Sequence, residues 1–341
     1  MADSIDLKFA ATSRSNTIRK INCGTTTPRM SGTVDVSCYK NLEELICPQN
    51  DITTVILVSS LEVLKARDNR LGAKLSDRPQ GGAFPLISDC ELLQYCDVGQ
   101  NVLSANIPEL SANVELTTFK CDNNQILAWN GSIDSIGQNL GRFEAQHNLL
   151  VEPTVDGILK SFDKAERNAS GNKECVLYLH EPGNSPPSFT GGILITADGA
   201  TFKQEGTTVT CTLVSDNPVY NEKCHGLENG WLVSFFTDTP TMTGTAVVNV
   251  LTLSSFSYQV IHSVTNPVIG SGVVTMRTTT NTTDGYRFYQ KLDLPLNQTY
   301  EGVQGKGWDV RVNQPTADIQ ECYVDYFDNG HFEPVLSYHT S

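Results

Sequence analysis

Apolar residues in the first half of the chain follow a short pattern that recurs five times. They occupy the first, fourth, sixth and eleventh positions of the pattern, and an asparagine occupies the ninth. The copies begin at Leu42, Leu61, Leu93, Leu116 and Leu140. Apolar residues spaced three and then two apart predict a turn that passes into a short strand, with its apolar side chains on one side.

The asparagines of the five copies form the second part of the pattern. They are Asn50, Asn69, Asn101, Asn124 and Asn148, at intervals of 19, 32, 23 and 24 residues. An asparagine amide can bond backbone groups that a sharp bend leaves unpaired, so each is predicted to tie its own coil to a neighbour. A single coil cannot bury its own apolar edge, and the coils are therefore expected to stack. The longest interval contains Arg78–Gly82, which predicts an inserted loop.

This pattern resembles the leucine-rich repeat, L-x-x-L-x-L-x-x-N-x-L, which implies a solenoid of stacked coils. Two weaker copies flank the five. One begins at Ile18 with Thr26 at the asparagine position. The other begins at Val176, with Glu181 at a core position and Asn184 at the asparagine position. The ending Gly183-Asn184-x-Pro186-Pro187 is similar to the last coil of leucine-rich-repeat proteins of bacteria and their phages.

Hydrophobic periodicity changes after the repeats. Before the last copy, apolar residues within Val155–Ala169 are spaced for one amphipathic helix. After Ile193, short β-rich runs alternate with turn residues. The predicted strands are Ile193–Thr196, Thr207–Leu213, Trp231–Phe236, Ala246–Leu253, Phe256–Ile261, Val273–Thr278, Tyr286–Leu292, Trp308–Val312 and Cys322–Phe327.

These patterns predict a mostly β protein, of the α+β class, in three parts. Residues 1–17 form an N-terminal arm or cap, in which Ile5–Phe9 alternates for one strand. Residues 18–190 form a short leucine-rich-repeat solenoid. Residues 191–341 form an antiparallel β-sandwich-like or barrel domain, which could divide into two small subdomains.

Composition and charge disfavour several classes of function. The net charge of −14 and a pI near 4.8 argue against nucleic-acid binding. The chain contains no run of 18 apolar residues, so the sequence predicts no membrane-spanning helix. The start at Met1 lacks the basic and apolar segments of a signal peptide. Cys23, Cys47, Cys96 and Cys121 fall on core positions, where free cysteine acts as a small apolar residue.

Motifs for catalysis and metal binding are weak throughout, so we expect no enzyme activity, cofactor or metal. Cys211 with Cys224 and His225 lacks C-x-x-C spacing, which disfavours a zinc site. Asp325, Asp328 and Glu333 form the only loose acidic cluster, where a glycan-active enzyme would need a carboxylate pair.

A repeat sheet instead presents outward side chains that are free to vary. The residues that flank the core positions carry charges of both signs and two tyrosines, as a specific contact would use. The candidate binding residues are Lys20, Glu44, Lys65, Arg67, Tyr95, Asp97, Lys120, Asp122, Arg142, Glu144, Tyr178 and His180. The equal alternative is an ordinary solvated surface.

Absence of an export signal, together with a Thr-, Ser-, Gly- and Asn-rich second half, favours a protein made in a cell and displayed on a particle. We therefore predict a non-enzymatic phage virion subunit, in a head decoration, tail or baseplate. Its partners would be other virion proteins, copies of itself, and a host-surface protein or glycan. A bacterial surface adhesin and a glycan-active enzyme on the C-terminal domain are the alternatives.

Overall fold

The chain folds into two compact units, each described by itself below. The computed structural model describes residues 17–24, 27–73, 82–131, 136, 139–165, 167, 169, 175–180, 182–188, 192–214, 227, 229–237, 239–252, 254–279, 285–300 and 303–313, with the backbone alone over 192–199 and 272–279. The first unit, here the ladder unit, comprises Met1–Arg167, Asn172–Pro187 and Val310–Asn313. The second, the β unit, comprises Asn168–Gly171, Ser188–Asp309 and Gln314–Ser341. The described structure is mostly β, in several sheets.

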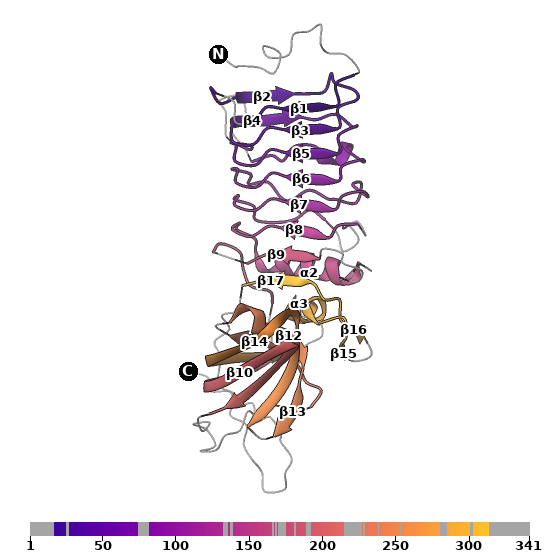
Figure 1. Ribbon diagram of the computed structural model, residues 1–341. Helices are drawn as coiled ribbons and strands as arrows, with labels where there is room; N and C mark the ends of the chain where they lie inside the picture. Colours follow the sequence, from indigo (N-terminus) through magenta and orange to yellow (C-terminus); the bar gives the residue numbers. More distant parts are fainter. Residues whose placement is uncertain are drawn as a thin grey trace. The chain divides into compact units, whose positions relative to one another are not determined.

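An eight-stranded sheet runs the length of the ladder unit, with its strands stacked one above another (Figure 1). In spatial order they are β1 (Lys20–Asn22), β3 (Glu44–Ile46), β5 (Val63–Lys65), β6 (Tyr95–Asp97), β7 (Thr118–Lys120), β8 (Arg142–Glu144), β9 (Val176–Tyr178) and β17 (Asp309–Arg311). From β1 to β9, neighbours pair in parallel, each residue opposite its counterpart. Equivalent positions in successive strands therefore lie opposite each other in the sheet.

The core of the ladder unit lies behind the middle residue of each strand. The middle residues are Ile21, Leu45, Leu64, Cys96, Phe119, Phe143 and Leu177, and each is at most 1% exposed. Phe119 and Phe143 stack with their ring centroids 5.6 Å apart. Cys23, Cys47 and Cys121 are buried free thiols one position after the strands, where the pattern has its third core residue. Each coil thus adds one layer of apolar side chains to a continuous core.

A strand pair, a 3-10 turn and a helix belong to the ladder unit but lie outside the eight-stranded sheet. β2 (Ser31–Asp35) and β4 (Asp51–Ile56) form a separate parallel pair beside the first coils, and a 3-10 turn, η2 (Ile87–Asp89), precedes β6. The predicted helix is α2 (Glu152–Lys164). It begins three residues earlier than predicted because Pro153 stands in its first turn, where a missing N–H is tolerated. Phe162 of α2 packs edge-to-face on Phe143, at 5.6 Å.

The last coil corrects our alignment of the sequence. β9 places Leu177, not Leu179, opposite Phe143. Leu179 is fully buried and takes the third core position that we assigned to Glu181. Asn184 bonds the carbonyl five residues before it, whereas the earlier asparagines bond the carbonyl three residues before them. Two extra residues therefore lie between strand and asparagine, and the alternative frame looked acceptable because Val176 is also apolar.

One backbone feature recurs in the six coils that end in Asn50, Asn69, Asn101, Asn124, Asn148 and Asn184. The residue before each of the first five asparagines has a positive φ, between 53° and 58° at Gln49, Asp68, Gln100, Asn123 and His147. Gly183 holds the same place before Asn184, with φ of 107°. The left-handed conformation costs a side-chain-bearing residue about 1–2 kcal/mol. We infer that the turn into the asparagine requires this conformation in all six coils.

Substitution of Gln100 tests that requirement, because its side chain is exposed and its main effect is on the backbone. We expect Gln100→Val to lower the free energy of unfolding by about 1–2 kcal/mol, since β-branched residues are the least tolerated at positive φ. Gln100→Asn should be neutral or slightly stabilising. Urea titration of both variants measures the difference, and equal midpoints for the two would contradict the requirement.

The β unit is organised around two long antiparallel strands, β10 (Gly192–Leu213) and β14 (Ser255–Thr279). With β11 (Leu232–Thr237), β12 (Gly244–Val247) and β13 (Asn249–Thr252) they form a five-stranded sheet. Each long strand joins two predicted short ones, so those predicted breaks were wrong. The register between β10 and β14 shifts after Ala197 and on both sides of Gly206. Such irregularities let a long strand bend instead of ending.

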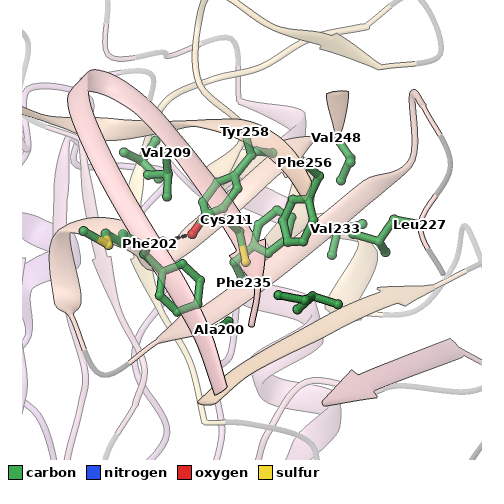
Figure 2. Close-up of a cluster of buried hydrophobic side chains, with 14 residues drawn as sticks. Ala200, Phe202, Val209, Cys211, Leu227, Val233, Phe235, Val248, Phe256 and Tyr258 are labelled. Atoms are coloured by element: carbon green, nitrogen blue, oxygen red, sulfur yellow. Dashed lines mark hydrogen bonds between the residues drawn. The ribbon is translucent and has the colours of Figure 1, made fainter. Parts of the chain in front are cut away.

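The core of this sheet is apolar and rich in aromatic residues (Figure 2). Phe235 stacks on Tyr258 with a centroid distance of 3.9 Å and on Phe256 at 5.6 Å. The Tyr258 hydroxyl donates a 2.7 Å hydrogen bond to the carbonyl of Met242, in the 3-10 turn η4 (Pro240–Met242). Burial raises the pKa of the Tyr258 hydroxyl well above its ordinary value. This cluster supports the sheet and offers no reactive group to solvent.

Two further predictions for the second half are corrected. The predicted strand Tyr286–Leu292 is a helix, α3 (Gly285–Asp293), in which Tyr286, Tyr289 and Leu292 are buried at helical spacing. The predicted strand Trp308–Val312 is β17, whose residues from Val310 onward belong to the ladder unit and not to a separate C-terminal domain. The described part of the β unit is β-rich, as predicted: it contains the five-stranded sheet and the hairpin of β15 (Thr299–Tyr300) and β16 (Val303–Gln304). The sandwich-like or barrel arrangement stays a prediction.

Some predicted features lie outside the described residues. These are the strand Ile5–Phe9, Thr26, Arg78–Gly81, Glu181, the pair Cys224–His225, and the strand Cys322–Phe327 with Asp325, Asp328 and Glu333.

Candidate functional site: the face of the parallel sheet

Six asparagines hold the coils at a fixed height and so position the sheet face. Each side-chain nitrogen donates to carbonyls of its own coil and of the coil before, and each side-chain oxygen accepts an N–H from the coil before. For Asn124, the donor reaches the carbonyls of Cys121, Asp122 and Val98 at 3.0–3.2 Å. Its oxygen accepts from the N–H of Leu103 at 2.9 Å.

Equivalent bonds are made by Asn50, Asn69, Asn101, Asn148 and Asn184. All six side chains are at most 9% exposed.

Three columns of side chains cross the sheet face, because every strand presents its first and third residues and the second residue after it. The first column is Lys20, Glu44, Val63, Tyr95, Thr118, Arg142 and Val176. The second is Asn22, Ile46, Lys65, Asp97, Lys120, Glu144 and Tyr178. The third is Gly24, Pro48, Arg67, Gly99, Asp122, Gln146 and His180.

The corrected frame moves the two residues of the last coil by one column each. Tyr178 lies opposite Glu144, not Arg142, and His180 follows Gln146 in the third column. Leu179 donates its N–H to the carbonyl of Arg311, which places Arg311 beyond Tyr178 on the same face. Sequence reasoning missed Arg311 because it lies more than 130 residues away in the chain, in a strand that we assigned to another domain.

Arg67 spans three coils of this face. Its guanidinium donates to both carboxylate oxygens of Asp122, at 2.8 and 2.6 Å, and to Asp97 at 3.3 Å. Gly99 lies beneath the span, and a Cβ there would overlap both Arg67 and Asp122. The absence of a side chain at Gly99 therefore makes the bridge possible, a role that only the structure reveals.

The two carboxylates of this bridge have opposite pKa shifts. Burial alone would raise the pKa of Asp122, but hydrogen bonds from Arg67 and Asn123 and the charge of Arg67 outweigh it, so the pKa is lowered. Burial raises the pKa of Asp97, and the Gly99 N–H and Arg67 oppose this only in part. Arg67 thus stabilises Asp122 as an anion more strongly than Asp97.

A second ion group occupies the next coils. Glu144, 6% exposed, receives Lys120 at 3.1 Å and the Nε of Arg142. Towards the start of the sheet, Lys20 and Glu44 pair at 2.5 Å across β1 and β3, and both are much more exposed. The carboxylates of the ion pairs are therefore buried in the middle of the face, whereas the pair near its beginning is solvated.

Both tyrosines of the face lie beneath cations. The Lys65 ammonium is 5.1 Å from the ring centroid of Tyr95. The guanidiniums of Arg311 and Arg142 are 4.3 and 6.0 Å from the Tyr178 ring, and His180 meets the same ring edge-on at 5.6 Å. The face thus presents cations held by rings and carboxylates.

Comparison of the chain with known protein families and with curated proteins finds no match. Across the described residues, no group of three or more His, Cys, Asp or Glu side chains could hold a metal ion. No described helix is long and apolar enough to cross a membrane. The sheet face is accordingly the candidate site that the geometry itself defines.

Proposed function

We propose that the ladder unit is a leucine-rich-repeat solenoid and that the chain acts by binding a partner through the face of its parallel sheet. Support for the repeat identity comes from residue-for-residue pairing over β1 to β9 and from asparagines in one bonded column. Support for binding comes from the arrangement of Arg67, Asp97 and Asp122. Side chains that are already bonded and half-buried lose little conformational freedom when a partner docks.

The setting that we propose is a phage virion, in which this chain is an attachment subunit without catalytic activity. It is supported by the similarity of the ending Gly183-Asn184-x-Pro186-Pro187 to coils of phage and bacterial repeat proteins. The partner would then be a component of a bacterial surface or of the virion itself. Because fold alone does not determine function, the face itself is the feature to test.

A steric block distinguishes a binding face from an ordinary surface. Thr118 is half-buried in the first column of the face, and Thr33 is exposed on β2, outside the eight-stranded sheet. We expect the labelled full chain to be retained on cells of at least one strain in a panel of bacteria. Thr118→Trp should reduce that retention about tenfold or more, because a bulky ring prevents close approach at the centre of an interface. Thr33→Trp should bind as the unmodified chain does.

Equal retention of both tryptophan variants would contradict the assignment of the face. Failure of the unmodified chain to bind any strain in the panel would contradict the attachment role.

A further inference from the structure

Charges on the sheet face are sorted by depth. The carboxylates form the lower layer, since Asp97, Asp122 and Glu144 are 9%, 1% and 6% exposed. The cations that bond them lie above: the Arg67 side chain is 31% exposed and its partner Asp122 2%, and Lys120 is 20% exposed and its partner Glu144 8%. Lys65 and Arg311 are exposed. An approaching molecule therefore meets nitrogen atoms before it meets carboxylate oxygens.

The cations in this upper layer are held in place. A guanidinium has five N–H donors, and the three hydrogen bonds that fix Arg67 use three of them. Arg311 lies against the Tyr178 ring, and Lys65 lies over Tyr95. A planar guanidinium of fixed orientation is suited to bidentate recognition of a carboxylate.

The face has more cations than anions, whereas the chain as a whole is acidic. The face carries six cations, Lys20, Lys65, Arg67, Lys120, Arg142 and Arg311, against five anions, Glu44, Asp97, Asp122, Glu144 and Asp309. The chain as a whole has a net charge of −14. An acidic partner would be repelled by most of the molecule and attracted here, which also fixes its orientation.

We propose that the face between β5 and β17 binds an acidic polypeptide segment, whose Asp and Glu carboxylates lie over Lys65, Arg67, Arg142 and Arg311. This inference rests on the proposed binding function and adds the chemistry of the partner. A polypeptide is favoured over a glycan because the Tyr95 and Tyr178 rings, on which sugars would stack, are engaged by cations. Carboxylates on flexible side chains can adapt to cations on successive strands.

Poly-L-glutamate is a direct probe of this chemistry. We expect fluorescently labelled poly-L-glutamate to bind the full chain saturably at low ionic strength, despite the acidic charge of both molecules, and to bind less tightly as salt is added. The double variant Lys65→Glu with Arg311→Glu should weaken binding about tenfold or more. The matched variant Lys40→Glu with Lys203→Glu changes two exposed lysines outside the face and should have a much smaller effect.

Single Lys65→Glu keeps the test decisive if the double variant does not fold, since it should weaken binding in the same direction. Alginate, an anionic polysaccharide, is the comparison ligand. Binding of alginate without poly-L-glutamate, binding of neither, or equal effects of the face and control variants would each overturn the proposal. If Thr118→Trp still abolishes retention on cells in that case, the face remains the binding surface and only the acidic-polypeptide chemistry is lost.

Discussion

Asn124→Ala is expected to lower the free energy of unfolding of the ladder unit by about 3–5 kcal/mol. The substitution removes the two side-chain N–H donors, which reach three carbonyls, and the acceptor of the N–H of Leu103, a fully buried residue. Each buried backbone group left unpaired costs about 1–3 kcal/mol. Urea unfolding, with hydrogen exchange followed in peptides of neighbouring coils, measures the loss and locates it.

A matched asparagine away from the ladder provides the control. Asn106 is exposed, and its side chain donates a hydrogen bond to the side chain of Asn130. Asn106→Ala should change stability by less than about 0.5 kcal/mol. Comparable losses for the two variants, or faster exchange confined to residue 124 itself, would show that the asparagines do not hold neighbouring coils together.

Arg67→Met is expected to be the most disruptive change on the sheet face, with a loss of about 2–3 kcal/mol at neutral pH. The variant keeps an apolar stem of similar length but leaves Asp122 and Asp97 without their shared cation. Breaking a buried ion pair from one side costs about 3–5 kcal/mol, and we expect less because the Arg67 side chain is 31% exposed. Lys65→Met, which removes an exposed cation from the same coil, should have little effect.

The pH dependence gives this prediction a separate readout. In the unmodified chain the pKa of Asp122 is lowered, so its stabilising contribution is present above the ordinary carboxylate pKa and is lost as pH falls through the lowered value. Without Arg67, burial dominates and the pKa of Asp122 should rise. The carboxyl then favours folding below its ordinary pKa, and this contribution is lost as pH rises through the raised value.

The stability difference between Arg67→Met and the unmodified chain should therefore shrink on acidification from about pH 7 to about pH 4. Urea midpoints at several pH values measure it. A difference independent of pH would mean that the loss comes from packing and not from the carboxylates. Gly99→Ala should reproduce part of the defect, because its Cβ would displace Arg67 from Asp122.

The sequence carries the repeat geometry well because the constraint is local and recurs. A coil needs apolar residues at fixed spacing and an amide at the bend. Both requirements can be recognised within eleven residues, as at Leu116–Ile126. Where a coil departs from the spacing, the pattern misleads. The two added residues before Asn184 left an alternative frame through Val176 and Glu181 that only backbone pairing could exclude.

Features that depend on residues far apart in the chain could not be predicted, because no local pattern marks them. Arg67 and Asp122 are 55 residues apart, and nothing in either segment marks them as partners. Gly99 looks like an ordinary loop glycine until the side chains that cross it are placed. α3 was predicted as a strand because its aromatic content favours β structure, although Tyr286, Tyr289 and Leu292 repeat at helical spacing.

The span of Arg67 also sets a limit on how this array can change length. Coils that share one bonding scheme can in principle be duplicated or deleted whole, since each new asparagine finds the same carbonyls and N–H groups on its neighbour. Insertion of a coil between Arg67 and Asp122 would separate the Arg67 guanidinium from the Asp122 carboxylate to which it donates. Growth of the array by duplication is therefore open outside that interval and obstructed within it.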